Sequence, residues 1–572
     1  MKSQKYKVNE IMYAISMILL MLIAVNIILT AVLLICNISV SAFNFPLSIV
    51  ITYLIWGCLI SKHTCIKDWC WLIGGSLFII LSSLILCRMF YDISWDGNAY
   101  HKLATGCLAY GWNPNYQTIE EFFSTSNLEH SAHYSATWPN LFPKGSWLFA
   151  SSIYKATGSI ECGKIINILS VVIVFIQSFY SFDNVMKSNI KRLCFSLILA
   201  LNPIVCSQIF TYYIDGALAN FLFVMLINLY SLSYEQDKPG RTQIISLFCT
   251  IVICSNLKFT GLAMAGVFCF SVFIFWMVRI WKDLELTVSE KQKKTIRVCL
   301  FYFVTVCVAV LIVGSSSYVK NTVLYHNPVY MVFGKDSVEM MKGMQPECFE
   351  QYSSYQKLFC SIFSKTEHLL TDQVCLKIPF TFSKEEFYNE STNTLRGGFG
   401  PFFSGVVICS LIIIAYEGCR LIKQHSKYVP FLVSMLCSVI FLAGIMDTCW
   451  VARYAPFVYI IPAMAIGLTE NFKNKIWSIC LSIFLLCLLL VDSFTFARGS
   501  IRDCYIRTNM INDSIESIGE KSSESQGIEI FVDNQYQFEG ALFDLRDWGI
   551  EYHLSKDNEG LDDYLAPYHI YY

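Results

Sequence analysis

Long apolar stretches separated by short polar ones run through most of the chain. A transmembrane helix needs about 20 apolar residues, and the stretches near this length predict 13 membrane spans. These spans cover residues 11–37, 45–61, 70–88, 164–182, 192–210, 216–233, 242–257, 261–281, 298–315, 401–417, 428–446, 452–469 and 475–495. The pattern predicts an all-α polytopic membrane protein.

The polar loops fall into two sets that alternate along the chain. One set is short and basic, and its Lys and Arg residues are Lys62, Lys67, Lys187, Lys191, Arg192, Lys238, Arg241, Lys282, Lys291, Lys293, Lys294, Arg297, Arg420, Lys423, Lys427, Lys473 and Lys475. Basic loops stay on the cytoplasmic side, and the N-terminal Lys2, Lys5 and Lys7 join them. We therefore expect a multi-pass cell-membrane protein with a cytoplasmic N-terminus and, because the span number is odd, an exoplasmic C-terminus.

The second set includes two long loops, residues 89–163 and 316–400, which the same rule places outside. Loops of this length without repeats are usually functional. Helical periodicity in the first loop predicts juxtamembrane helices over 98–110 and 145–154. Residues 1–495 are expected to form one membrane domain that carries both loops.

A third outer segment, residues 496–572, is expected to form a small α/β tail. The alternating run Ile528–Val532 predicts a strand, residues 540–547 a helix, and residues 549–554 a second strand. This tail is too small to hold a catalytic domain of its own.

The amino-acid composition also favours a membrane protein over a soluble one. The chain of 572 residues is 55% hydrophobic and 15% charged, whereas a soluble domain carries about 25% charge. The net charge of −1 gives no reason to expect a nucleic-acid partner. Most of the 24 cysteines are scattered through apolar runs, which is typical of small hydrophobic residues rather than of disulfides or a zinc site.

The most informative polar stretch is Tyr91–His101, directly after the third predicted span. It contains two acids, Asp92 and Asp96, where packing gives no reason for either. Acids at a membrane are costly when buried, so they are often functional. The alternative is that Asp96 or Ser94 caps the helix that follows.

Further charged residues recur at the outer ends of other spans. They are Asp215, Lys258, Lys320, Asp447 and Arg453, and each lies in a short cluster rich in aromatic residues, Gly or Pro. The cytoplasmic loops carry charge but no such clusters. This asymmetry predicts one cavity on the outer face, with Lys144 as a further anion contact.

These residue types suit group transfer from a lipid phosphate. A carboxylate can take the proton of an attacking hydroxyl, and Arg or Lys can hold the leaving phosphate. The donor phosphate contacts expected here are Arg453, Lys258, Lys144 and Lys320. The expected substrate contacts are Trp95, Tyr100, His101, Tyr213, Asp215 and Asp447.

Structural alternatives stay open for several of these residues. Asp215 could simply start a helix, Lys258 could snorkel to the membrane surface, and Arg453 could pair with Asp447. No cofactor is required by the pattern, although the acids have the oxygen ligands that a divalent cation such as Mg²⁺ or Mn²⁺ prefers. His130 and His133 have metal-ligand spacing but no evident third ligand.

Six short strings carry a resemblance to a known family. They are Ser94–His101, Gly111–Pro114, Phe142–Trp147, Tyr213–Gly216, Lys258–Gly261 and Ala452–Pro456. Together with the order of spans and loops, they resemble the GT-C superfamily of integral-membrane glycosyltransferases, over about the first 470 residues. The resemblance implies a polyprenyl-phosphate sugar donor and acids in the first outer loop.

One departure from the family concerns these acids. They are adjacent or one residue apart in many family members, but Asp92 and Asp96 are four apart. By matching position, Asp96 is the expected catalytic base and Asp92 the second candidate. The resemblance implies an inverting transfer of sugar to a glycan, lipid or protein acceptor on the outer face of the bilayer.

Three other functions remain as alternatives, one of them a non-catalytic scaffold or receptor with the tail as its binding module. A polysaccharide polymerase or ligase would use related chemistry, but a large outer loop late in the chain is more typical of it. A lipid-linked glycan transporter or flippase predicts charges near mid-membrane and inverted repeats, and the sequence has neither. Glycosyl transfer is therefore the expected activity.

Overall fold

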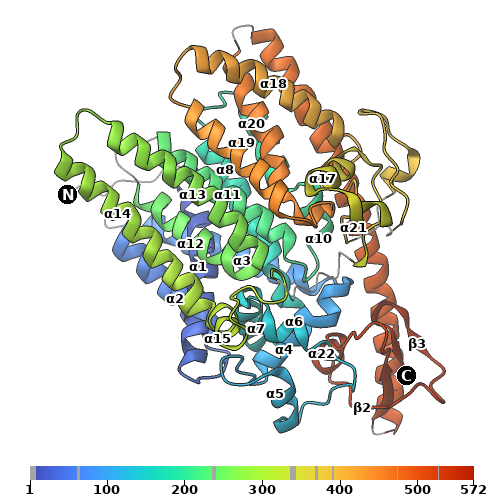
Figure 1. The fold of residues 1–572 in the computed structure, drawn as a ribbon. Coiled ribbons are helices and arrows are strands. Elements are labelled where there is room, and N and C mark those ends of the chain that lie inside the picture. Colours follow the sequence, from blue (N-terminus) through green and yellow to red (C-terminus); the bar gives the residue numbers. More distant parts are fainter. Residues whose placement is uncertain are drawn as a thin grey trace.

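The computed structural model describes residues 8–60, 65–234, 240–334, 343–367, 371–388, 392–472, 475–525 and 527–572. The fold is a large helical bundle with a small sheet at the C-terminal end (Figure 1). Lys2, Lys5, Lys7, Lys62, Lys238 and Lys473, on which part of the topology prediction rests, lie outside the described residues.

The predicted membrane spans coincide with helices. These are α1 (Val8–Ile35), α2 (Asn44–Ile55), α3 (Ile66–Arg88), α8 (Ile165–Ser181), α9 (Asn189–Ala200), α10 (Pro203–Gln208), α11 (Asp215–Tyr234), α12 (Arg241–Leu257), α13 (Phe259–Lys282), α14 (Val288–Val306), α18 (Phe403–Lys423), α19 (Val429–Ile445), α20 (Ile460–Thr469) and α21 (Lys475–Ser525). Within the described ranges, eight helices are long and apolar enough to cross a membrane, and four apolar helices are shorter. The polytopic helical class is confirmed, whereas the number 13 stays a prediction.

One predicted span, 192–210, is two helices rather than one. The break between α9 and α10 falls at Asn202–Pro203. Pro203 has no backbone N–H for a continuing helix, and the Asn202 side chain accepts a hydrogen bond from the Val205 N–H at 3.3 Å. This is an N-cap that starts a new helix.

Helix α1 lies at the centre of the bundle, where it packs against α2, α3, α7, α8 and α12 (Figure 1). Its apolar residues surround the whole helix, which is typical of a helix buried on all sides. The helices α18, α19 and α20 form a second group, and α13 and α21 connect it to the rest.

Helix α21 continues about 30 residues past the predicted end of the last span. No proline interrupts the polar part, and Cys504, Ile511, Ile515 and Ile518 continue a buried stripe along it. Three of them, Ile511, Ile515 and Ile518, pack against the tail sheet. Tertiary packing of an amphipathic face therefore carries the helix beyond the apolar run.

The tail contains the three elements expected from the sequence. They are β1 (Ile528–Val532), α22 (Ala541–Asp547) and β2 (Tyr552–Leu554), with β1 and β2 parallel. Two short strands, β3 (Tyr564–Leu565) and β4 (Ile570–Tyr571), complete a sheet of order β2-β1-β4-β3. The α/β prediction for the tail is confirmed.

The loop over residues 89–163, which the topology prediction places outside, contains both expected helices. The helix predicted over 98–110 is a π-helical turn, Gly97–His101, followed by α4 (Lys102–Ala109), and the second is α7 (Gly145–Thr157). Two shorter helices lie between them, α5 (Ile119–Thr125) and α6 (Thr137–Leu141). The second loop contains α15 (Lys320–Tyr325) and α17 (Ser354–Phe363).

The tail packs directly on the first outer loop. The Gly540 N–H donates to the Asn98 carbonyl at 2.8 Å, and a Cβ on Gly106 would collide with the Phe543 ring. Figure 1 places α22 beside α4, at the end of the bundle opposite α18. The tail is thus part of the wall around the first loop.

Candidate functional site

Four charged side chains from distant parts of the chain meet at one end of the bundle. Asp96 precedes the π-helical turn, Asp215 begins α11, Lys258 separates α12 from α13, and Arg453 lies in a 3₁₀ turn, Ala452–Tyr454. We call this group the Arg453 cluster. The sequence predicted that these residues would converge, and the structure brings all four together.

The four charges alternate in sign. Arg453 Nη1 lies 3.1 Å from Asp96 Oδ2 and 3.4 Å from Asp215 Oδ2. Lys258 Nζ lies 2.8 Å from Asp215 Oδ1. Asp215 therefore holds both cations, and Arg453 joins both acids.

Local backbone geometry sets the position of Lys258. Its φ and ψ of −157° and 151° are extended, so the chain turns sharply between two helices. The turn is tight because a Cβ on Gly261 would approach the Cys254 carbonyl oxygen to 2.2 Å. Only glycine allows this approach, so the Lys258–Gly261 string has a structural reason.

Two tyrosine rings enclose the guanidinium. Arg453 Cζ lies 4.5 Å from the centre of the Tyr213 ring and 4.9 Å from that of Tyr454. Lys258 Nζ lies 3.9 Å above the Tyr454 ring. Cation–π contacts of this kind are stronger when water is excluded, and Arg453 is buried.

Arg453 is charged, because arginine stays protonated in proteins and two acids lie within 3.4 Å of its guanidinium. Its Nε is buried and has no hydrogen-bond partner among the described residues. The Arg453 guanidinium is therefore a permanent cation whose Nε–H group is free to donate a hydrogen bond.

Tyr100 and His101 line a small cavity beside the charges. The Trp147 Nε1–H donates to His101 Nδ1 at 2.6 Å, so the other ring nitrogen carries the proton in the neutral form. Burial, then the charge of Lys258, lowers the pKa of His101 to about 3. The cavity, about 10 Å³, is lined by Asp96, Tyr100, His101, Phe142, Pro143, Trp147, Tyr213, Ile214, Asp215, Leu257 and Lys258.

Asp92 lies apart from this cluster. It is fully buried, and its two carboxylate oxygens accept the backbone N–H groups of Ser94 and Tyr212 at 2.9 and 3.1 Å. Its own N–H donates to Glu161. In this structure Asp92 fixes the loop that carries Asp96.

Lys144 and Lys320, both predicted as phosphate contacts, also lie outside the cluster. Lys144 donates to the carbonyls of Asn140, Phe142 and Ser316, and burial, then Lys320, lowers its pKa well below the usual value. Lys320 donates to the Pro114 carbonyl at 2.8 Å. These two lysines are engaged by backbone oxygens.

Asp447 pairs with Lys357 at 2.7 Å, so the alternative of an Asp447–Arg453 pair is wrong. Trp95 lies next to Asp96 and packs edge-to-face on Phe538 of the tail, with ring centres 6.5 Å apart. Trp95 is partly exposed, which places an aromatic ring at the rim of the cluster.

Two aromatic residues of the site were not selected as site residues from the sequence. Tyr454 and Trp147 both lie in strings that carried the family resemblance, but neither was selected. The available signal for Tyr454 was its position next to Arg453. Trp147 gave no comparable signal, because an aromatic residue in an apolar helix usually packs in the core.

A second buried ion cluster was not predicted at all. Lys102 Nζ lies 2.5 Å from Glu161 Oε1 and 2.7 Å from Asp544 Oδ2. Lys164 also pairs with Glu161, and the Tyr568 hydroxyl donates to Asp544 at 2.7 Å. We call these five residues the loop–tail ion cluster, because they join the first outer loop to the tail.

A divalent cation has few ligands available here. Asp96 and Asp215 are the carboxylates of the Arg453 cluster, and each has an oxygen against a cation. The described part of the chain contains no group of three His, Cys, Asp or Glu residues placed to hold a metal. Mg²⁺ or Mn²⁺ binding stays a prediction.

Comparisons with known proteins give a likeness in fold. No family model matches the chain, and no curated protein matches it. The crystal structure of ArnT from Cupriavidus metallidurans in the apo state is similar, with 11% identity, a TM-score of 0.44, and coverage of 85% of this chain and 86% of that one. The structure of the same protein bound to undecaprenyl phosphate has 11% identity, a TM-score of 0.46, and coverage of 86% of each chain.

Proposed function

We propose that this protein is a membrane glycosyltransferase of the GT-C type. It would move a sugar from a polyprenyl-phosphate donor to a hydroxyl group of a glycan, lipid or protein acceptor on the outer face of the cell membrane. The observation that carries this proposal is the Arg453 cluster, which sets a partly exposed carboxylate beside a buried, permanently charged guanidinium.

Asp96 is the proposed base. Its side chain is 15% exposed, and Arg453 contacts one of its oxygens, Oδ2. No hydrogen bond to Oδ1 is found within the described residues, so this oxygen can meet an acceptor hydroxyl. Asp92 is less suited, because backbone N–H groups use both of its oxygens.

Arg453 and Lys258 are the proposed phosphate contacts. Asp215 holds both in place, and hydrogen bonds from charged donors to phosphate oxygens are strong. Cations aimed at the position where negative charge develops favour the transition state over the ground state.

The reaction would proceed as one displacement. The acceptor oxygen forms a bond to the anomeric carbon while the bond from that carbon to the phosphate oxygen breaks, and Asp96 takes the hydroxyl proton. The polyprenyl phosphate leaves with the bond electrons, facing Arg453 and Lys258. Attack opposite the leaving group inverts the anomeric carbon.

Trp95, the partly exposed ring at the rim of the cluster, supplies an aromatic surface for the sugar. Tyr100 and Trp147 are buried behind it, in contact edge-to-face at 6.4 Å between ring centres. His101 is neutral at physiological pH because its pKa is about 3. It is therefore suited to hydrogen bonding to a sugar hydroxyl rather than to proton transfer.

The test is transfer by the purified protein from a panel of polyprenyl-phosphate sugars. Asp96→Asn and Asp92→Asn would be assayed beside the unmodified protein. The proposal expects sugar transfer from at least one lipid donor, and a far greater loss for Asp96→Asn than for an equally folded Asp92→Asn. Unchanged transfer by Asp96→Asn rules out Asp96 as the base, and transfer from nucleotide sugars alone rules out the lipid donor.

A further inference from the structure

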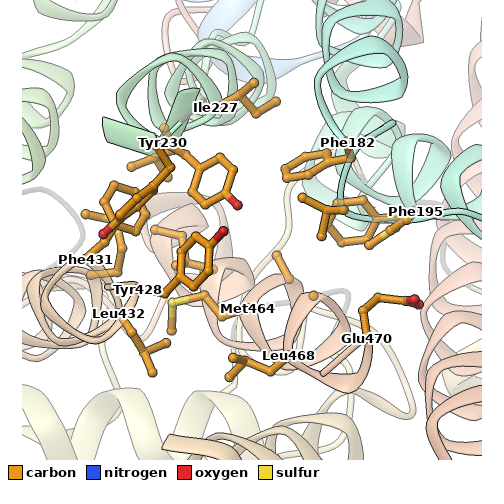
Figure 2. A pocket seen from close by; sticks show the side chains of 18 of the residues that line it. Phe182, Phe195, Ile227, Tyr230, Tyr428, Phe431, Leu432, Met464, Leu468 and Glu470 are labelled. Atoms are coloured by element: carbon orange, nitrogen blue, oxygen red, sulfur yellow. The ribbon is translucent and has the colours of Figure 1, made fainter. Parts of the chain in front are cut away.

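A second cavity lies at the opposite end of the bundle from the Arg453 cluster. Its volume is about 430 Å³, which is within the range of about 300–1,000 Å³ common for small-molecule sites. Figure 2 shows side chains from several helices around it, including Phe195 of α9, Ile227 and Tyr230 of α11, and Met464 and Leu468 of α20.

Helix α11 gives the separation between the two sites. Asp215 of the Arg453 cluster is its first residue, and Tyr230 lines the cavity 15 residues later. At a rise of about 1.5 Å per residue, the two lie about 22 Å apart along the helix. The cavity is therefore well separated from the groups that react at Asp96.

The walls of the cavity are apolar and aromatic. Phe182, Phe195 and Phe431 face it, with aliphatic groups of Ile227, Leu432 and Leu468 between them (Figure 2). Covering apolar surface stabilises a complex by about 25 cal/mol per Å². Such a space between membrane helices suits a hydrocarbon chain.

The charged residues that line the cavity are Lys187 and Glu470. Glu470 pairs with Lys191 at 3.0 Å, and two ion pairs next to lining residues join Arg192 to Asp183 and Arg420 to Glu417, the latter at 2.8 Å. Each of these acids is therefore neutralised. Lys187, which lines the cavity, and Lys427, next to the lining residue Tyr428, have no acidic partner within the described ranges.

We infer that this cavity binds an anionic phospholipid, with an acyl chain between the helices and the headgroup phosphate near Lys187 and Lys427. Basic pockets between membrane helices on the cytoplasmic side bind anionic headgroups. The positive-inside rule assigns this end of the bundle to the cytoplasm, and the cytoplasmic leaflet is rich in anionic lipids.

The cavity can be filled by one substitution. Gly467 lines it, and a Cβ built at this position meets no atom within 4 Å. Gly467→Leu therefore places a side chain where the acyl chain would lie. Gly266 of α13 is a matched control, because it is also helical, its Cβ position is equally open, and it does not line the cavity.

The experiment measures binding of spin-labelled phosphatidylglycerol to the full-length protein in nanodiscs of phosphatidylcholine. We expect Gly467→Leu to weaken binding about tenfold, which corresponds to about 1.4 kcal/mol. Gly266→Leu should bind as the unmodified protein does. Equal binding by Gly467→Leu and the unmodified protein would overturn the inference.

The headgroup assignment is tested separately, by substituting the two exposed lysines. Lys187→Gln with Lys427→Gln should abolish the preference for phosphatidylglycerol over phosphatidylcholine, and the exposure of Lys187 makes a folding defect a poor explanation for such a change. An unchanged preference would overturn the headgroup assignment. Competition by polyprenyl phosphate that displaces phosphatidylglycerol would make the occupant a carrier lipid and overturn the inference as well.

Discussion

The Arg453 cluster and the loop–tail ion cluster are built from the same kinds of residue but differ in access. In the loop–tail ion cluster, the exposed fractions of the Lys102, Lys164, Glu161 and Asp544 side chains are 0%, 0%, 4% and 2%. In the Arg453 cluster, Arg453 and Asp215 are only 4% and 3% exposed, but Asp96 is 15% and Lys258 18% exposed. Buried charges alone therefore do not distinguish a functional site from a structural ion cluster. The two clusters differ in whether a ligand can reach one of the charged groups.

Removing the accessible acid should give the largest effect on activity. Asp96→Asn keeps the size of the side chain and removes the base, so the rate of transfer should fall about 10²–10⁴-fold. The melting temperature should change little, because Asp215 still neutralises Arg453. Initial rates and thermal unfolding measure the two effects, and a large loss of stability with normal transfer would place Asp96 with the structural acids.

Changing the shape of the cation should give the next largest effect. Arg453→Lys keeps the charge but loses the planar fork and its stacking on Tyr213. We expect the rate constant kcat to fall about 10²–10³-fold, with a smaller change in KM. Arg420→Lys, at the other end of the bundle, is the matched control and should leave both constants unchanged.

Breaking the loop–tail ion cluster should lower the stability of the fold rather than the transfer rate. Lys102→Met leaves Asp544 without its cation, and removing one partner of a buried pair costs about 3–5 kcal/mol. Thermal unfolding should show this loss, and the transfer rate per folded molecule should change much less. Lys521→Met, which breaks a half-exposed pair with Asp563 in the same tail, should destabilise far less.

The smallest expected effect is a pH dependence of the tail. Burial, with a contribution from Glu161, raises the pKa of Asp544 above its usual value despite the nearby Lys102. A carboxyl group whose pKa is higher in the folded state stabilises the fold at low pH and loses this contribution as pH rises through its folded-state pKa. Unfolding curves measured from about pH 4 upward should show the decline, and Asp544→Asn should flatten it; an identical decline in the variant would contradict this assignment.

Much of the fold follows from local patterns. The apolar runs predicted the helices, and the alternation in Ile528–Val532 predicted β1, because both depend on residues close in sequence. The length of α21 was missed for a physical reason. Its polar half is helical because Ile511, Ile515 and Ile518 pack on a sheet that forms from later residues, and a hydropathy pattern does not report such a partner.

The convergence of the four charged residues was predictable, but their pairing was not, and four other predicted site residues lie outside the cluster. Topology alone brought Asp96, Asp215, Lys258 and Arg453 to one face. The partners of Arg453 were not predictable, since Asp447 is close in sequence yet pairs with Lys357. Lys102 and Asp544 are 442 residues apart, and nothing local to either residue indicates the other.

The same separation has a consequence for how the molecule is made. Lys102 and Glu161 are synthesised hundreds of residues before Asp544. Until α22 has been translated, Lys102 and Lys164 share one acid, Glu161, and the cluster lacks its second anion. A nascent chain stalled before Asp544 therefore carries an unfinished loop beside Asp96.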